Sequence, residues 1–164
     1  SVGAGTGATV GKICGMERAM KSGLGMYAVQ LGELRMAAVV AVNALGDIFD
    51  SSTGRKIAGL RTEDGTAFSD SCEELWKMGQ RENLFTGNTT IGAVITNGKF
   101  NKAQMNKIAS MTRNAYARCI NPVGTMADGD SIYAASAGEV EADLNVAGTL
   151  AAYVMERAIV AAIR

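Results

Sequence analysis

Hydrophobic and polar positions in the first half of the chain favour β-strands. Residues 24–31 alternate between the two kinds of side chain and predict a strand. The apolar run MAAVVAVNA, residues 36–44, favours a strand that is buried on both faces. Residues 44–59 predict a hairpin that turns at 51–54, and the β-branched segment 89–96 predicts a further strand.

The second half predicts two helices separated by a strand. Asn101 can cap the first helix, with Gln104 three residues later as in a capping box. Pro122 closes that segment, residues 129–138 predict a strand, and the second helix covers roughly 140–164. The helical stripes consist of Met105, Ile108, Thr112, Ala115 and Cys119, and of Leu144, Ala147, Ala151, Val154 and Ala158. This order of elements predicts an α/β fold with helices packed on sheet layers.

Two segments lack a regular pattern. Residues 61–87 are polar, with a short helical piece at 71–78, and connections of this length are usually functional or processed. Residues 1–12 form a glycine-rich loop without a starting methionine, so we expect that an upstream segment is missing.

The composition of the chain excludes more classes of function than it indicates. The 164 residues can form one domain, and sixteen basic residues balance sixteen acidic ones. Zero net charge gives no electrostatic reason to expect nucleic acid or an anionic membrane as a partner. The apolar run 36–42 is too short to span a bilayer, and Glu156-Arg157 interrupts the apolar C-terminal stretch.

The chain contains no histidine, and this excludes Ser-His-Asp and Cys-His mechanisms and every histidine metal site. A catalytic base must then be a carboxylate, a lysine or an α-amine. Cys14, Cys72 and Cys119 are scattered and odd in number, which favours free thiols and a cytoplasmic location.

No cofactor or metal motif is complete. The segment Gly7 to Lys12 is one residue too short for a phosphate loop, and no strand precedes the dinucleotide-like spacing that starts at Gly3. A calcium-like loop at Asp128 breaks where Tyr133 replaces the obligatory glycine. We therefore expect neither a cofactor nor a metal.

Asp128 and Asp130 flank one glycine and can converge on one point. Two carboxylates this close form an acid/base pair or a receptor for an ammonium group, unless they belong to a solvated turn before a strand. Asn43 ends an apolar run and can stabilise an oxyanion or satisfy a buried strand end. Lys12 leaves the glycine loop and can equally be an exposed lysine.

The sequence FTGNTTIGAVITNG, residues 85–98, contains a possible cleavage site at Asn88–Thr89. A hydroxyl residue can attack the carbonyl that precedes it, and hydrolysis of the resulting ester leaves a new N-terminal threonine. Its amine has a reference pKa of about 7.7–8.0 and can activate its own hydroxyl without a histidine. The alternative is that Thr89 and Thr90 only begin a strand.

Four motifs in order, SVGAGTGATVGK, VAVNALGD, GNTTIGAVITN and DGDSIYA, resemble the DmpA-type peptidases. This family contains L-aminopeptidase/D-Ala-esterase/amidases, β-aminopeptidases and 6-aminohexanoate-oligomer hydrolases. The resemblance covers essentially the whole chain. It implies a four-layer αββα sandwich, an oligomer, and an inactive precursor that cuts itself into an α and a β chain.

Transferred to this sequence, the resemblance implies that residues 1–88 end the α chain and residues 89–164 form the β chain of one catalytic domain. It assigns these roles: Thr89 as nucleophile after a cut from Asn88, Lys12 as the charge beside its amine, Asn43 as oxyanion donor, and Asp128 and Asp130 as the acidic pair. Aminopeptidase members carry serine as nucleophile and a Ser/Glu pair, so the threonine and two aspartates here are closer to the nylon-oligomer branch.

The function expected from this resemblance is hydrolysis of short peptides or amides through an acyl-enzyme ester. Two alternatives stay open. The ornithine acetyltransferases share a related fold and a self-generated threonine, and transfer the acyl group to an amine. An inert relative that never cuts itself would serve as a binding or assembly module.

Overall fold

The structure is a computed structural model that describes residues 3–79 and 87–163. Its elements, in chain order, are η1 (Gly3–Gly5), β1 (Thr9–Val10), β2 (Met20–Lys21), β3 (Leu24–Leu31), β4 (Leu34–Ala41), β5 (Asp47–Asp50), β6 (Arg55–Ala58), α1 (Ser71–Met78), β7 (Ile91–Gly98), α2 (Lys102–Cys119), β8 (Ile120–Asn121), β9 (Ser131–Val140) and α3 (Leu144–Ala161). The predicted strands and helices occur in the predicted order, while η1 and the two-residue strands β1, β2 and β8 were not predicted.

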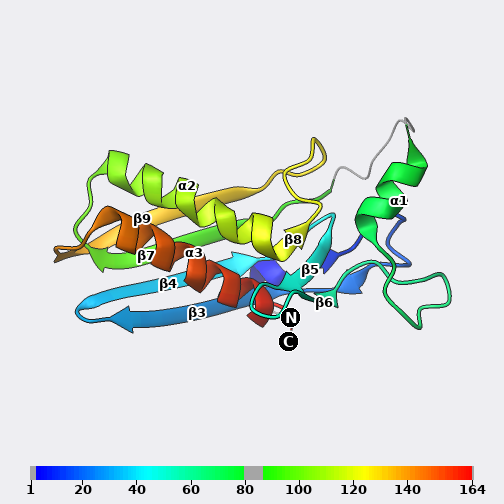
Figure 1. Cartoon of the computed structure of the whole chain (residues 1–164), viewed down its shortest axis with the longest axis horizontal. Helices are drawn as coiled ribbons and strands as arrows, with labels where there is room; N and C mark the ends of the chain where they lie inside the picture. Colours follow the sequence, from blue (N-terminus) through cyan, green and yellow to red (C-terminus); the bar gives the residue numbers. More distant parts are fainter. Residues whose placement is uncertain (1–2, 80–86, 164) are drawn as a thin grey trace.

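The main sheet has the strand order β3-β4-β7-β9. Its first three strands pair antiparallel, whereas β7 and β9 pair in parallel and are connected through α2. Figure 1 shows α2 and α3 lying side by side across one face of this sheet. The predicted α/β class is confirmed, and the described residues supply one helix layer and one sheet layer of it.

Strand β4 shows how the two faces of the main sheet differ. Met36, Ala38 and Val40 are buried beneath the helices, at 4% exposure or less. Ala37 and Val39, which point to the opposite face, are only half-buried. The prediction of a strand buried on both faces is therefore wrong for the described residues, because both helices that pack on the main sheet lie on one side of it.

Helix α2 begins as the sequence predicts. The Asn101 side chain accepts from the Gln104 amide, and the Gln104 side chain accepts from the Asn101 amide, so the capping box is complete. The predicted stripe is buried against the sheet and α3. Helix α1 also coincides with its prediction at 71–78, where the Asp70 side chain accepts two amide hydrogen bonds at the N-terminus.

Helix α3 is, within the described ranges, the single helix that is long and apolar enough to cross a membrane by length and composition, despite Glu156-Arg157. Half of this stretch is buried inside the protein. Its buried residues pack on α2, β3 and β4, and the Glu156 carboxylate accepts from the Arg118 side chain of α2. These contacts are those of a core helix.

The smaller sheet, of order β6-β5-β8, is held by a buried carboxylate. Asp47 is 1% exposed and pairs with the Lys56 ammonium at 2.6 Å. It also accepts from the Leu60 amide at 2.8 Å and from the Ser71 amide and hydroxyl at 3.0 and 2.7 Å. One side chain therefore ties the predicted hairpin to the start of α1.

We expect Asp47→Ala to destabilise the protein by about 3–5 kcal/mol, because it leaves the half-buried Lys56 charge and the Ser71 donors without their carboxylate. The free energy of unfolding in guanidinium, followed by circular dichroism, measures the loss. Asp64→Ala is the matched control, since Asp64 is exposed and bonds only within its own turn. Equal stability of the two variants would contradict the prediction.

Candidate active site

The candidate site lies where β7 and β9 begin side by side. Just ahead of their parallel ladder, Asn88 forms an isolated parallel bridge with Asp128. The Gly129 amide donates to the Asn88 carbonyl at 2.9 Å. The parallel pairing of two strands 40 residues apart thus places the Asn88–Thr89 bond beside the two predicted aspartates.

Strand β7 begins at Ile91, two residues later than the predicted strand. The reason lies in the hydrogen bonds of the two threonines ahead of it. The Thr89 amide donates to the Asn43 carbonyl at 2.9 Å, and the Thr90 amide donates to the Asp130 carboxylate at 2.7 Å. The Thr89 bond continues the register of β4 and β7 beyond Ile91, whereas the Thr90 amide bonds to a side chain of the candidate site.

Asn43 brings the predicted site residues from three segments together. Its carbonyl accepts from the Thr89 amide and also from the Lys12 ammonium, the latter at 3.2 Å. Its side-chain oxygen accepts from Lys12 at 2.8 Å and from the Thr9 amide at 3.2 Å, and its side-chain nitrogen donates to the Gly87 carbonyl at 3.0 Å. Lys12 and the Thr89 nitrogen consequently meet on one oxygen atom.

Lys12 is 1% exposed, so its ammonium is not the solvated group that a glycine-loop lysine could have been. The loop that carries it is tightly packed, with the Gly11 amide on the Gly46 carbonyl and the Lys12 amide on the Leu45 carbonyl. Gly11 has φ +67°, and a Cβ atom there would lie 2.0 Å from the Leu60 nitrogen. Burial lowers the pKa of Lys12 to about 8, although the nearby negative charge of Asp128 opposes this shift.

This lowered pKa predicts a pH dependence of stability. Between pH 8 and about 10.5 the unfolded chain keeps the Lys12 proton that the folded protein has lost, so the contribution of Lys12 to the free energy of unfolding rises with pH in this window. Lys12→Met is expected to lack this rise, whereas Lys107→Met, which replaces an exposed lysine of α2, retains it. Unfolding measured at pH 7.5 and 10 checks the difference, and parallel pH profiles of Lys12→Met and the wild type would contradict it.

The two aspartates are anchored by different partners. Asp128 accepts from the Thr125 amide at 2.9 Å and from its hydroxyl at 2.7 Å. Asp130 accepts from the Thr90 amide, and burial together with the charge of Asp128 raises the pKa of its carboxyl. Asp130 therefore bonds to the backbone one residue after Thr89. The Thr89 hydroxyl itself donates to the Asn88 carbonyl at 2.6 Å.

The calcium-like spacing does not form a metal site. Glu139 lies near the end of β9 and pairs with Lys99 on the surface, away from the two aspartates that begin this spacing. Across residues 3–79 and 87–163, no three His, Cys, Asp or Glu side chains lie close enough together to hold a metal ion.

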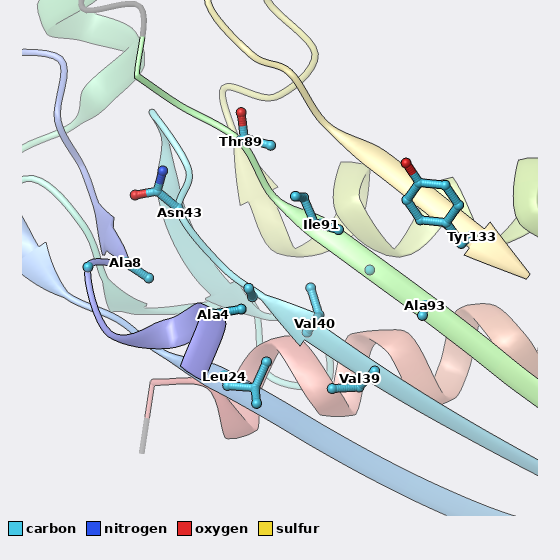
Figure 2. A pocket seen from close by; sticks show the side chains of 13 residues that line it. Ala4, Ala8, Leu24, Val39, Val40, Asn43, Thr89, Ile91, Ala93 and Tyr133 are labelled. Atoms are coloured by element: carbon cyan, nitrogen blue, oxygen red, sulfur yellow. The ribbon is translucent and has the colours of Figure 1, made fainter. Parts of the chain in front are cut away.

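A cavity of about 660 Å³ opens beside the candidate nucleophile, over the uncovered face of the main sheet. Figure 2 shows Thr89 and Asn43 together at one end, with the apolar side chains of Ile91 and Val39 on the neighbouring strands. None of its described lining residues is an Asp, Glu, Lys or Arg. The cavity is also lined by Ala4, Leu24, Val40, Ala41, Ala93 and Tyr133.

Three residues of the site were not predicted. Gly129 supplies an amide to the Asn88 carbonyl, Thr125 holds Asp128, and Tyr133 lines the cavity. In the sequence Gly129 is only a spacer between two aspartates, and nothing in its context distinguishes an amide that donates to the Asn88 carbonyl. Tyr133 follows from strand alternation only after the face of β9 is known.

The sequence profile of Peptidase family S58 matches residues 1–164. The chain belongs to this family. Relatives include an uncharacterized aminopeptidase of Mycobacterium leprae, 32% identical over 144 residues that are 87% of this chain and 38% of the relative. A 6-aminohexanoate-oligomer endohydrolase of Kocuria sp. is 30% identical over 146 residues, 85% of this chain and 39% of the relative. The resemblance predicted from four motifs is confirmed.

Solved structures support the fold of this S58 chain. The L-aminopeptidase D-Ala-esterase/amidase of Ochrobactrum anthropi, described as a variant of the Ntn hydrolase fold, matches with a TM-score of 0.59 at 18% identity, over 96% of this chain and 42% of that one. A Burkholderia β-aminopeptidase matches with a TM-score of 0.57 at 16% identity, over 96% and 44%. The S58 chain described here spans about two fifths of the length of the curated relatives it matches.

Proposed function

We propose that this S58 chain is the part of a self-processing amidohydrolase that carries Thr89 as its N-terminal nucleophile. The observation that supports this most is the shared carbonyl of Asn43, which holds the Thr89 nitrogen and the Lys12 ammonium together. A second support is the Thr89 hydroxyl, which is hydrogen-bonded to the carbonyl that a cut would release. These two contacts support the proposal because they involve the nitrogen and the hydroxyl that an N-terminal threonine would use as base and nucleophile.

After the cut, the Thr89 amine is the base and the Thr89 hydroxyl attacks the substrate carbonyl. The positive charge of Lys12 beside the amine lowers the amine pKa and keeps it neutral near pH 7. The side-chain amide of Asn43 donates to the developing oxyanion, and water hydrolyses the acyl-enzyme ester. Each role uses a residue that already borders the candidate site.

The proposed substrates are short peptides or amides with a free amino end. The cavity beside Thr89 is lined by apolar side chains, which suits an uncharged acyl chain. Asp128 and Asp130 do not line this cavity, but they bond to the backbone at Asn88 and Thr90 on either side of Thr89, and we propose that one of them pairs with the substrate ammonium. Relatives named as aminopeptidases and as 6-aminohexanoate-oligomer endohydrolases are consistent with this class.

We propose further that this chain works together with the remaining part of a longer precursor, since its relatives are more than twice as long. The uncovered face of the main sheet carries exposed apolar side chains from three strands, among them Met26, Ile95 and Tyr133. A second sheet packed on this face, with a helix layer on its far side, would give the αββα sandwich and close the cavity.

Denaturing mass spectrometry of the purified full-length protein tests the proposed self-cleavage. We expect two polypeptides that meet between Asn88 and Thr89, the second with the N-terminal sequence TTIGAV. A single intact mass after prolonged incubation would favour the inert relative and contradict the proposal. Product analysis with and without an added amine acceptor then separates hydrolysis from acyl transfer, because an acyltransferase forms a new amide.

A further inference from the structure

The carbonyl of Asn88, which self-cleavage would release as an acid, is bonded by two groups. The Gly129 backbone N–H donates to it at 2.9 Å, and the Thr89 hydroxyl donates to it at 2.6 Å. Asn88 itself is 1% exposed. The nucleophile and a backbone donor thus converge on one buried carbonyl group.

The side chain expected to stabilise an oxyanion is occupied elsewhere in the uncut chain. The Asn43 side-chain nitrogen donates to the Gly87 carbonyl at 3.0 Å, one residue before the bond to be cut. Its side-chain oxygen holds Lys12 and the Thr9 amide. Asn43 therefore does not contact the carbonyl that Thr89 would attack first.

We propose that the backbone N–H of Gly129 is the oxyanion donor for cleavage of the Asn88–Thr89 bond, whereas the Asn43 amide serves substrate hydrolysis after the cut. This inference rests on the proposed self-processing. It assigns the two reactions of one nucleophile to two different hydrogen-bond donors.

The residues on either side fix the direction of this N–H. Asp128 is held by the Thr125 amide and hydroxyl, and Asp130 is held by the Thr90 amide. Both aspartates are thus positioning residues for the amide between them. A donor held in place before the reaction stabilises developing charge without reorganisation.

The position also explains why the residue between the aspartates is glycine. A Cβ atom at Gly129 would lie 2.8 Å from the Thr89 hydroxyl oxygen. Any larger residue would push the hydroxyl away from the carbonyl that it must attack. Glycine supplies the donor and leaves the nucleophile in contact.

The acyl shift from nitrogen to oxygen needs no other reactant, and the hydrolysis that follows needs only water. The Thr89 oxygen forms a bond to the Asn88 carbonyl carbon, and the negative charge on the former carbonyl oxygen is held by the Gly129 N–H. The carbon–nitrogen bond then breaks, and the hydroxyl proton passes to the Thr89 nitrogen. Water hydrolyses the resulting ester, which leaves a carboxylate on Asn88 and restores the Thr89 hydroxyl.

Replacing one backbone amide by an ester tests the proposal in the full-length precursor. Glycolic acid introduced at position 129 removes the N–H and keeps the shape. We expect self-cleavage, timed by denaturing electrophoresis, to slow by about 10²–10³-fold. The control ester at position 131 removes the Ser131 amide bond to the Thr90 carbonyl, one step farther along the same strand pair, and should slow cleavage less than about tenfold.

The outcomes of this experiment distinguish a failure of the proposed function from a failure of the inference about Gly129. An unmodified precursor that is never cut removes the proposed function, and this inference with it. An unmodified precursor that is cut, together with an ester at 129 that is cut equally fast, overturns the inference alone. If the ester at 129 prevents folding, a crystal structure of the Thr89→Val precursor decides, because a Gly129 nitrogen more than about 3.5 Å from the Asn88 oxygen also overturns it.

Discussion

Thr89→Ala is expected to abolish self-cleavage and amide hydrolysis together. The variant loses the oxygen that donates to the Asn88 carbonyl in the uncut chain, and it keeps the amide bond to Asn43. Turnover should fall by about 10⁴-fold or more, as for removal of the nucleophile in other acyl-transfer enzymes. Denaturing mass spectrometry measures the cut, and release of product from a peptide amide measures turnover.

Two controls make this result specific to the hydroxyl of one residue. Thr89→Ser keeps a hydroxyl on the same carbon and should still be cut. Thr90→Val removes the neighbouring hydroxyl, leaves the β-branched shape unchanged, and keeps the amide that holds Asp130. Retained hydrolysis in Thr89→Ala, or loss of cleavage in Thr90→Val equal to that in Thr89→Ala, would remove Thr89 from the mechanism.

Local features of the sequence predicted local structure well. The capping box at Asn101 and the short helix at 71–78 depend on residues within one or two turns, and both have the predicted limits. The hairpin of β5 and β6 is likewise set by its own turn. The role of Asp47 could not be predicted, since its partners Lys56 and Ser71 are brought to it only by the tertiary fold.

The sequence predicted which residues belong to the candidate site but not how they contact one another. Motifs in the sequence named Lys12, Asn43 and Thr89, which are separated by 31 and 46 residues. No spacing rule states that Lys12 and the Thr89 nitrogen bind the same carbonyl, because that depends on the glycine loop packing against the segment between β4 and β5. The strand predicted from Thr89 starts at Ile91, and the Thr90 amide just ahead of it bonds to the Asp130 side chain, a partner that no local pattern indicates.

Sequence patterns did not predict which face of the main sheet is buried. Ala37 and Val39 are as apolar as their neighbours on β4, and an apolar run cannot say which other segment covers each face. The described residues leave one face open and place the cavity there. Apolar side chains on that face are consistent with the proposal that further chain packs against it.

Asn43→Asp is expected to reduce the turnover of the cut enzyme by about 10²–10³-fold with little change in KM. The introduced carboxylate keeps an oxygen for Lys12 and for the Thr9 amide, so the site should hold its shape. It loses the N–H groups that would stabilise an oxyanion, and that interaction is made in the transition state rather than with bound substrate. Steady-state kinetics on fully cut protein measure the two constants separately.

Asn97→Asp is the matched control for this substitution. Asn97 also bridges two segments, accepting from the Arg35 amide and donating to the Glu33 carbonyl, but it lies at the far end of β7. Its replacement should leave kcat within about twofold, because no reacting group is near. If Asn43→Asp retains the wild-type kcat, the substrate oxyanion is held by another donor. The Gly129 N–H would then be the first candidate, because the cut separates the Asn88 carboxylate from Thr89 and can release this amide for a second carbonyl.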